Sequence, residues 1–185
     1  MGNEMKITEA RISGVLVFEA PVYRDHRGYF QEAFRREFLE KAGVDLDWKQ
    51  DNLSVSAPNV VRGLHYQLVR PQAKLIQVVH GAAFDVIVDI RMSSPTYGEH
   101  ITFDLKAGDG KSVLIPAGFA HGFAALEPDT AFLYKVSESY LPEGDRTILW
   151  NDPELGITWP VTEAEAIVSE KDRRGAAFSA AEVFP

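Results

Sequence analysis

The chain has 185 residues, 45% of them hydrophobic and 25% charged, which is the composition of an ordinary globular protein. Its formal net charge of −8 disfavours a general nucleic-acid-binding surface, and the absence of cysteine excludes disulfides and thiolate chemistry. There is no apolar run long enough for a membrane span and no basic-then-apolar leader after Met1, so we expect one cytoplasmic domain over residues 1–185.

The first predicted helix lies near the N-terminus, in the segment "EAFRREFLEKAG" at residues 32–43. A helical period places Phe34, Phe38 and Leu39 on one stripe, and Gly43 is a suitable residue to end the helix. We therefore expect a short helix that carries an apolar stripe and flanks the predicted sheet structure.

The segment "VVRGLHYQ" at residues 60–67 is typical of a strand, because β-branched and aromatic residues dominate it. Side chains alternate between the two faces of a strand, so His65 points away from Leu64 and Tyr66 and shares a face with Gly63 and Gln67. The pattern alone does not say whether that histidine binds a metal, moves a proton or only accepts a hydrogen bond.

Period-two alternation continues through "FDVIVDIR" at 84–91 and "EHITFDLK" at 99–106. Turn-forming residues at 93–98, 106–111 and 126–130 separate the runs. Short strands at this spacing, with no helix between them, predict an all-β antiparallel sandwich or barrel. A second helical patch at 162–175 carries two capping signals, one from Thr162 to Glu165 and one from Ser169 to Asp172.

Candidates for proton transfer are few, because the chain has only five histidines, at positions 26, 65, 80, 100 and 121. His121 closes "IPAGFAHGF", a turn-then-histidine pattern found at the cavity wall of many cupin-type barrels, although it could also be a core histidine. Tyr134 in "FLYKV" could be an acid or one more half-buried aromatic residue. Lys74 begins a strand and could equally be a solvated lysine at a sheet edge.

A transition-metal site is disfavoured by the spacing around His65. Metal-binding cupins supply two histidines one residue apart, and here the residue two positions after His65 is Gln67. That leaves His65 and His121 as the imidazoles of the proposed cavity, with no cysteine to replace a missing ligand. The sequence therefore favours acid–base chemistry without a metal.

Several motifs in order resemble one family. They are "DHRGYFQEAF", "QDN", "RGLHYQ", "QAKLIQVVHGAAFDVIVDIRMSSPTYG", "IPAGFAHGF", "FLYK", "ILWNDPELGITWP" and "SEKD", from about residue 15 to the end of the chain. Together they resemble the dTDP-4-dehydrorhamnose 3,5-epimerases, metal-free cupins of dTDP-L-rhamnose synthesis. The resemblance implies a cupin-type jelly-roll barrel with a few short flanking helices, and no cofactor. It implies a dTDP-4-keto-6-deoxy sugar substrate and no nucleic acid or membrane partner.

The resemblance also implies roles for four catalytic residues. His65 of "RGLHYQ" resembles the family's base, and Asp172 of "SEKD" resembles the carboxylate that orients this base. Tyr134 resembles the acid on the opposite face of the substrate. Lys74 would lie near the keto oxygen, where a cation stabilises enolate charge. His65 is then expected to point into the barrel with Gln67.

For the sugar nucleotide, the resemblance implies binding residues, some of which could instead be ordinary surface charges. These are Arg27, Glu32, Gln50, Asn52, Arg62, His121, Asp145 and Lys171. Family members are homodimers in which an N-terminal segment of one subunit lies against the barrel of the other. Arg27 and Glu32 would then serve the neighbour's site.

Two departures from the family pattern leave alternatives open. Leu53 stands where many members have histidine, and Asp145, Arg146 and Thr147 replace Glu-Gly-Gly. A relative that epimerises only C3 or only C5 of another dTDP-4-keto-6-deoxy sugar is therefore an alternative. From other classes, a metal-dependent cupin enzyme and a non-catalytic sugar-nucleotide binder are also retained.

Overall fold

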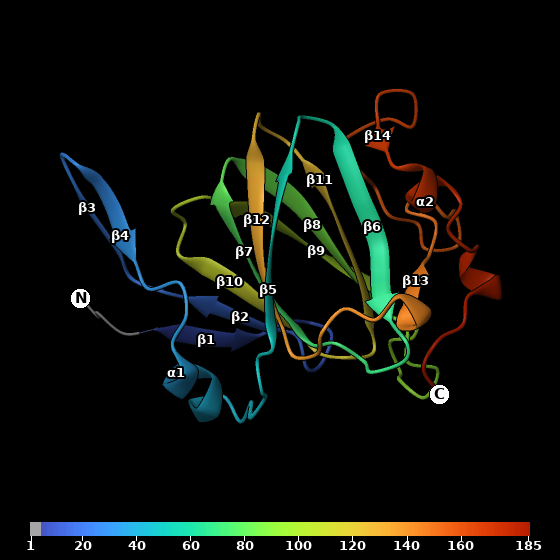
Figure 1. Cartoon of the computed structure of the whole chain (residues 1–185), viewed down its shortest axis with the longest axis horizontal. Helices are drawn as coiled ribbons and strands as arrows, with labels where there is room; N and C mark the ends of the chain where they lie inside the picture. Colours follow the sequence, from blue (N-terminus) through green and yellow to red (C-terminus); the bar gives the residue numbers. More distant parts are fainter. Residues whose placement is uncertain (1–4) are drawn as a thin grey trace.

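Two antiparallel sheets stack against each other in the computed structural model, which describes residues 5–185 (Figure 1). The first sheet has the strand order β1-β2-β10-β7-β12-β5, and the second has the order β13-β6-β11-β8-β9 with β14 parallel to β6. A separate hairpin consists of β3 and β4. The all-β prediction with short flanking helices is confirmed.

The elements follow one another in chain order as short strands with few helical turns. They are β1 (Lys6–Glu9), β2 (Leu16–Glu19), β3 (Val22–Asp25), β4 (Gly28–Gln31), α1 (Arg36–Lys41), β5 (Gln50–Ser56), β6 (Val60–Gln67), β7 (Lys74–His80), β8 (Ala82–Asp89), β9 (His100–Lys106), β10 (Lys111–Ile115), β11 (Phe119–Ala125), β12 (Thr130–Val136), η1 (Pro142–Gly144), β13 (Asp145–Thr147), β14 (Ile167–Val168), α2 (Glu170–Arg173) and η2 (Phe178–Ala180). None of the helices within residues 5–185 is long and apolar enough to cross a membrane.

The main core lies between the two sheets. Ile76 from β7 and Phe132 from β12 pack there against Ile87 from β8 and Phe123 from β11, and all four side chains are almost fully buried. The rings of Phe123 and Phe132 stack with centroids 4.2 Å apart. Burial of side chains of this size stabilises the fold by about 1.5–3 kcal/mol each, so this layer fixes how the sheets face each other.

The outer face of the second sheet is covered by the C-terminal part of the chain, seen beside β6 in Figure 1. Leu64 and Tyr66 of β6 pack there with Val86 and Val88 of β8, against C-terminal residues such as Phe178. The predicted alternation along β6 and β8 is confirmed. His65, which points the other way from Leu64 and Tyr66, consequently faces the interior of the sandwich.

The helix predicted over 32–43 is shorter than expected, since α1 spans only Arg36–Lys41. Its N-cap residue, Arg35, makes no side-chain capping bond, and Phe34 precedes the helix and packs against Trp48 instead. Leu39 is buried as predicted, whereas Phe34 is 40% exposed. The stripe prediction was therefore wrong for Phe34.

The second helical prediction, over 162–175, is correct only for its last part. The Glu165 carboxylate does accept from the Thr162 N–H at 3.3 Å, as in a capping box, and also from the Thr162 hydroxyl at 2.6 Å, but residues 163–165 make a turn. The helix α2 begins after Ser169, whose hydroxyl accepts a hydrogen bond from the Asp172 N–H at 3.1 Å. The second capping signal is thus confirmed.

Candidate active site

His65 and Asp172 form a close pair although they are 107 residues apart in sequence. The His65 Nε2 lies 2.6 Å from Asp172 Oδ1; the Asp172 side chain is almost fully buried, and that of His65 is 32% exposed. An imidazole held by a buried carboxylate keeps one tautomer and one orientation, and its other nitrogen remains available for a proton. This is the arrangement of a general base.

The position of Asp172 follows from local structure. β14 pairs in parallel with β6, and the chain then enters α2 through the Ser169 cap, which brings Asp172 to the level of Gly63. Burial raises the pKa of Asp172, but hydrogen bonds from His65, Gly63 and Ser169 outweigh it, so the pKa of Asp172 is lowered overall. The carboxylate is therefore anionic at neutral pH.

Gly63 is required beside this pair because of backbone geometry. It adopts a φ of +136°, and its N–H donates to Asp172 Oδ2 at 3.3 Å. A Cβ at this position would lie 2.6 Å from the Gly122 Cα, closer than such atoms approach in proteins. Glycine therefore lets β6 and β11 approach closely enough to present His65 next to His121.

Lys74 begins β7 in the opposite sheet and reaches across to β6. Its Nζ donates to the backbone oxygen of His65 at 3.0 Å. Burial of the ammonium group lowers the pKa of Lys74 to about 8, while the nearby carboxylates of Asp145 and Asp85 oppose that shift. Lys74 is thus a buried cation beside the backbone of His65 and not a solvated strand-edge residue.

Tyr134 lies on the inner face of β12, two residues after Phe132, with which its ring stacks at 5.6 Å. Its hydroxyl is 3.4 Å from the Ser54 hydroxyl of β5. Burial raises the pKa of Tyr134 well above its ordinary value, so the phenol is protonated at neutral pH. It can therefore donate a proton, as an acid must.

His121 is directly opposite His65 in the pairing of β11 with β6, and its ring contacts Tyr134 across the sandwich with centroids 6.1 Å apart. Its Nε2 lies 2.6 Å from Asp85 Oδ1, and both side chains are buried. Burial lowers the pKa of His121. Asp85 was not predicted as a site residue; the signal for it in the sequence was an aspartate within the mainly apolar run of β8.

The candidate base and the candidate acid come from opposite sheets. His65 and His121 project from the second sheet, whereas Tyr134 and Lys74 project from the first, where Tyr134 pairs with Ile76 two residues from Lys74. A molecule held between the sheets would meet the imidazole on one side and the phenol on the other. This arrangement suits removal and return of protons on opposite faces of one carbon.

Four predicted binding residues lie on elements next to those that carry the catalytic candidates. Gln50 and Asn52 of β5 are bonded to each other at 2.6 Å, and Gln50 also accepts from the Tyr140 N–H at 3.1 Å. Asp145 accepts from the Tyr140 hydroxyl at 3.0 Å and pairs with Lys171, the neighbour of Asp172. These side chains lie around the catalytic candidates.

Two polar side chains of β6 stand on either side of His65. Arg62 is held by the Ser56 hydroxyl at 3.0 Å and by the Val55 carbonyl at 3.2 Å. Gln67 was expected beside His65, and its amide instead bonds backbone groups of Arg70, Ser139 and Leu141. It orders the loop that carries Tyr140.

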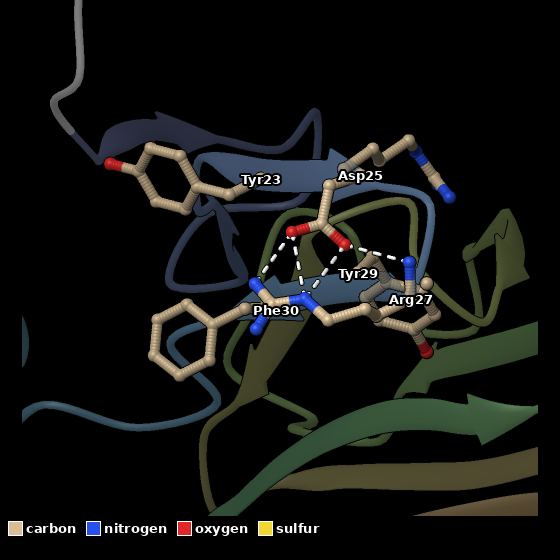
Figure 2. Close-up of a pocket in the computed structure, with 7 residues that line it drawn as sticks. Tyr23, Asp25, Arg27, Tyr29 and Phe30 are labelled. Atoms are coloured by element: carbon tan, nitrogen blue, oxygen red, sulfur yellow. Dashed lines mark hydrogen bonds and ion pairs between the residues drawn. The ribbon is translucent and has the colours of Figure 1, made fainter.

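Arg27 and Glu32 are not brought to this site within one chain. They belong to the region of the β3–β4 hairpin, which projects from the sandwich in Figure 1. Figure 2 shows Arg27 turned back onto Asp25 of the same hairpin, with the closest pair of atoms 2.6 Å apart, beside a hollow of about 390 Å³. Glu32 forms an ion pair with Arg35.

No group of three or more His, Cys, Asp or Glu side chains in residues 5–185 is placed to hold a metal ion.

Comparison with known proteins places this geometry in a family. The family model described as dTDP-4-dehydrorhamnose 3,5-epimerase matches residues 9–180. A Pseudomonas aeruginosa dTDP-4-dehydrorhamnose 3,5-epimerase is 47% identical over 182 residues, covering 98% of this chain and 100% of the relative. The structure of the Legionella pneumophila dTDP-6-deoxy-D-glucose-3,5-epimerase in complex with dTDP-4-keto-L-rhamnose matches with a TM-score of 0.92 at 38% identity, covering 97% of this chain and 95% of that one.

A further relative differs in its reported activity. The 3'-monoepimerase ChmJ from Streptomyces bikiniensis, in complex with dTDP-quinovose, matches with a TM-score of 0.86 at 34% identity, covering 92% of this chain and 87% of that one. All these matches extend over nearly the whole chain, and the match to the family model includes the positions of the four catalytic candidates. The chain belongs to the dTDP-4-dehydrorhamnose 3,5-epimerase family, a family of isomerases with a cupin-like β-sandwich.

Proposed function

We propose that this protein epimerises dTDP-4-dehydro-6-deoxy-D-glucose at C3 and C5, forming dTDP-4-dehydro-L-rhamnose for dTDP-L-rhamnose biosynthesis. The observation that carries the proposal is that His65, paired with Asp172 of α2, comes from one sheet, whereas the Tyr134 phenol comes from the inner face of the other. A cytoplasmic location remains a prediction from the sequence.

The chemistry needs a base, an acid and a cation. The C4 keto group acidifies the hydrogens on C3 and C5, so His65 can take one of them as a proton and leave an enolate. Lys74 is placed to stabilise the enolate oxygen, a contribution often worth about 3–4 kcal/mol in such sites. Tyr134 then gives its proton to the opposite face of the carbon, which inverts it, and solvent restores both protonation states.

We assign the nucleotide to the cations and amides around the cavity. Arg62 suits a diphosphate because its planar guanidinium can donate two parallel hydrogen bonds. Gln50, Asn52, Asp145 and Lys171 offer donors and acceptors at the same rim. His121 is assigned a substrate contact from the cavity wall.

A single-site epimerase is the second candidate, favoured by the similarity to the 3'-monoepimerase. The Leu53 departure carries little weight in this choice, because the Leu53 side chain is 64% exposed on the face of β5 opposite to Asn52 and Ser54. In the segment 145–147, which differs from the family pattern, the carboxylate of Asp145 pairs with Lys171, and Arg146 pairs with Glu182.

Product analysis tests the proposed activity. The purified protein is incubated with dTDP-4-dehydro-6-deoxy-D-glucose and an excess of a reductase that accepts the L-sugar, and the products are resolved by proton NMR. Accumulation of the L-sugar supports the proposal. No conversion despite dTDP-sugar binding would favour a non-catalytic binder, and activity lost to a chelator and restored by metal would favour a metal-dependent cupin.

The lowered pKa of Lys74 predicts an alkaline limit to activity. The ammonium form is the useful one, so kcat/KM should fall as the pH rises through about 8, the pKa of Lys74 in the free enzyme. In Lys74→Arg the guanidinium stays charged, so this limb should disappear even if the maximal rate is lower. A pH profile of both proteins checks this. If Lys74→Arg shows the same fall in kcat/KM near pH 8, that fall belongs to the titration of another group.

We further propose that the protein is a homodimer in which the β3–β4 hairpin reaches the site of the partner. Tyr23, Tyr29 and Phe30 on this hairpin are 44–67% exposed, which is unusual for aromatic side chains unless another surface covers them. Sedimentation should give a dimer, and Arg27→Ala should raise KM with little change in kcat. A monomer with full activity would contradict the arrangement.

A further inference from the structure

One face of β5 carries only polar side chains. Gln50, Asn52, Ser54 and Ser56 alternate with Asp51, Leu53 and Val55, which are exposed. Gln50 bonds Asn52 within this face, and the Ser56 hydroxyl accepts from Arg62 of β6 at 3.0 Å. Ser54 lies in the middle of this face.

Ser54 touches the proposed acid directly. Its hydroxyl oxygen is 3.4 Å from the Tyr134 hydroxyl oxygen, and within residues 5–185 this is the hydrogen-bond partner that the structure gives that phenol. The aromatic neighbours of the Tyr134 ring within residues 5–185 are the rings of Phe132 and His121. Ser54 is itself half-buried, and either hydroxyl can be the donor.

The direction of this hydrogen bond matters for catalysis. A phenol has one hydrogen, so a Tyr134 that donates to Ser54 cannot donate to the substrate at the same time. If Ser54 donates instead, the Tyr134 hydrogen is free to point into the cavity. After proton transfer, the Tyr134 oxyanion also accepts a hydrogen bond from Ser54. This bond stabilises the charged form of Tyr134, which burial disfavours.

We propose that Ser54 is a positioning residue that donates to Tyr134 and thereby directs the Tyr134 proton toward the substrate carbon. This inference rests on the proposed function. In this step the O–H bond of Tyr134 breaks and a C–H bond forms on the enolate carbon. Tyr134 is left as an oxyanion, which accepts a hydrogen bond from Ser54 until solvent returns a proton.

The proposed role of Ser54 affects the rate of inversion but not the rate of deuterium exchange, and one experiment measures both rates. In deuterated water, His65 can remove a proton, exchange it through its exposed edge and return deuterium to the same face, which labels the substrate without inverting it. Inversion additionally needs Tyr134. Loss of Ser54 should therefore slow inversion while leaving exchange by His65 intact, whereas a general structural defect would slow both equally.

The test compares Ser54→Ala, Ser54→Thr and Val55→Ala with the native protein, using dTDP-4-dehydro-6-deoxy-D-glucose in deuterated water. Losing a hydrogen bond to a charged group should raise the ratio of exchange to inversion about tenfold in Ser54→Ala. Ser54→Thr restores the hydroxyl and should return the native ratio. Val55→Ala, on the exposed face of the same strand, should leave the ratio unchanged.

The outcomes distinguish the two proposals. An unchanged ratio in Ser54→Ala, with both rates reduced in parallel, overturns the role of Ser54. Should Ser54→Ala not fold, Ser54→Cys retains the side-chain volume with a weaker donor, and it should give a ratio between those of the native protein and the tenfold increase. No turnover in the native protein would instead count against the proposed function itself.

Discussion

Replacing His65 by glutamine is expected to lower kcat by about 10²- to 10⁴-fold, the usual contribution of a positioned general base. The imidazole is the one group of the proposed site that pairs with a buried carboxylate and also retains exposed surface, so no neighbour can take over its role easily. Glutamine can still bond Asp172 but cannot accept a proton near neutral pH. Steady-state kinetics on the dTDP-sugar substrate measure the loss.

Two controls make the His65 result specific. His80→Gln changes an exposed histidine that bonds only the Asp129 backbone in the described chain, and it should keep native activity. The dissociation constant of dTDP for His65→Gln, measured by calorimetry, should stay close to the value for the native protein. Turnover near the native rate in His65→Gln would remove this residue as the base.

Replacing Tyr134 by phenylalanine is expected to abolish most inversion while proton exchange continues. The substitution removes only the hydroxyl, and the ring can still stack on Phe132 and contact His121. An acid in such a position typically contributes about 10²- to 10⁴-fold, so the rate of L-sugar formation should fall within that range. Proton NMR of the recovered substrate in deuterated water reports exchange in the same sample.

The matched control for Tyr134 is Tyr140→Phe, which also removes one phenol but at an exposed position bonded to Asp145. It should affect KM more than the ratio of exchange to inversion. Equal losses of exchange and inversion in Tyr134→Phe would mean that Tyr134 acts before the proton is removed, contrary to its role as the acid.

That His65 lies on the face opposite to Leu64 and Tyr66 was predictable, because strand alternation depends on local geometry alone. Strand alternation puts Leu64 and Tyr66 together, and their burial under the C-terminal segment leaves His65 facing the interior. The Ser169–Asp172 cap was predictable for the same reason, since its two partners are three residues apart.

The pairing of His65 with Asp172 depends on tertiary structure, and periodicity could not supply it. It needs β14 to lie parallel to β6, a contact between segments about 100 residues apart, and only the family resemblance pointed to it. Asp85 was overlooked because a carboxylate within β8 looks like an outward-facing polar residue. Both faces of β8 are in fact covered, so Asp85 is buried and needs His121 as its partner.

The prediction of a helix over 32–43 was wrong in its length and in the position of Phe34, for a different physical reason. Its apolar residues have a helical spacing, but no capping side chain fixes the start, and Phe34 gains more contact from Trp48 and Lys135 outside the helix. Packing by distant residues thus overrode the local pattern.

In the proposed mechanism, one base (His65) and one acid (Tyr134), on opposite sheets, act on both carbons next to the keto group. The most direct measurement is the position of deuterium in the sugar after incubation of the native protein with dTDP-4-dehydro-6-deoxy-D-glucose in deuterated water, read by proton NMR. We expect label at both C3 and C5, with the L-configured product. Label at one carbon only would contradict the double epimerisation and identify a single-site enzyme, and no label at either carbon would contradict the proposed chemistry.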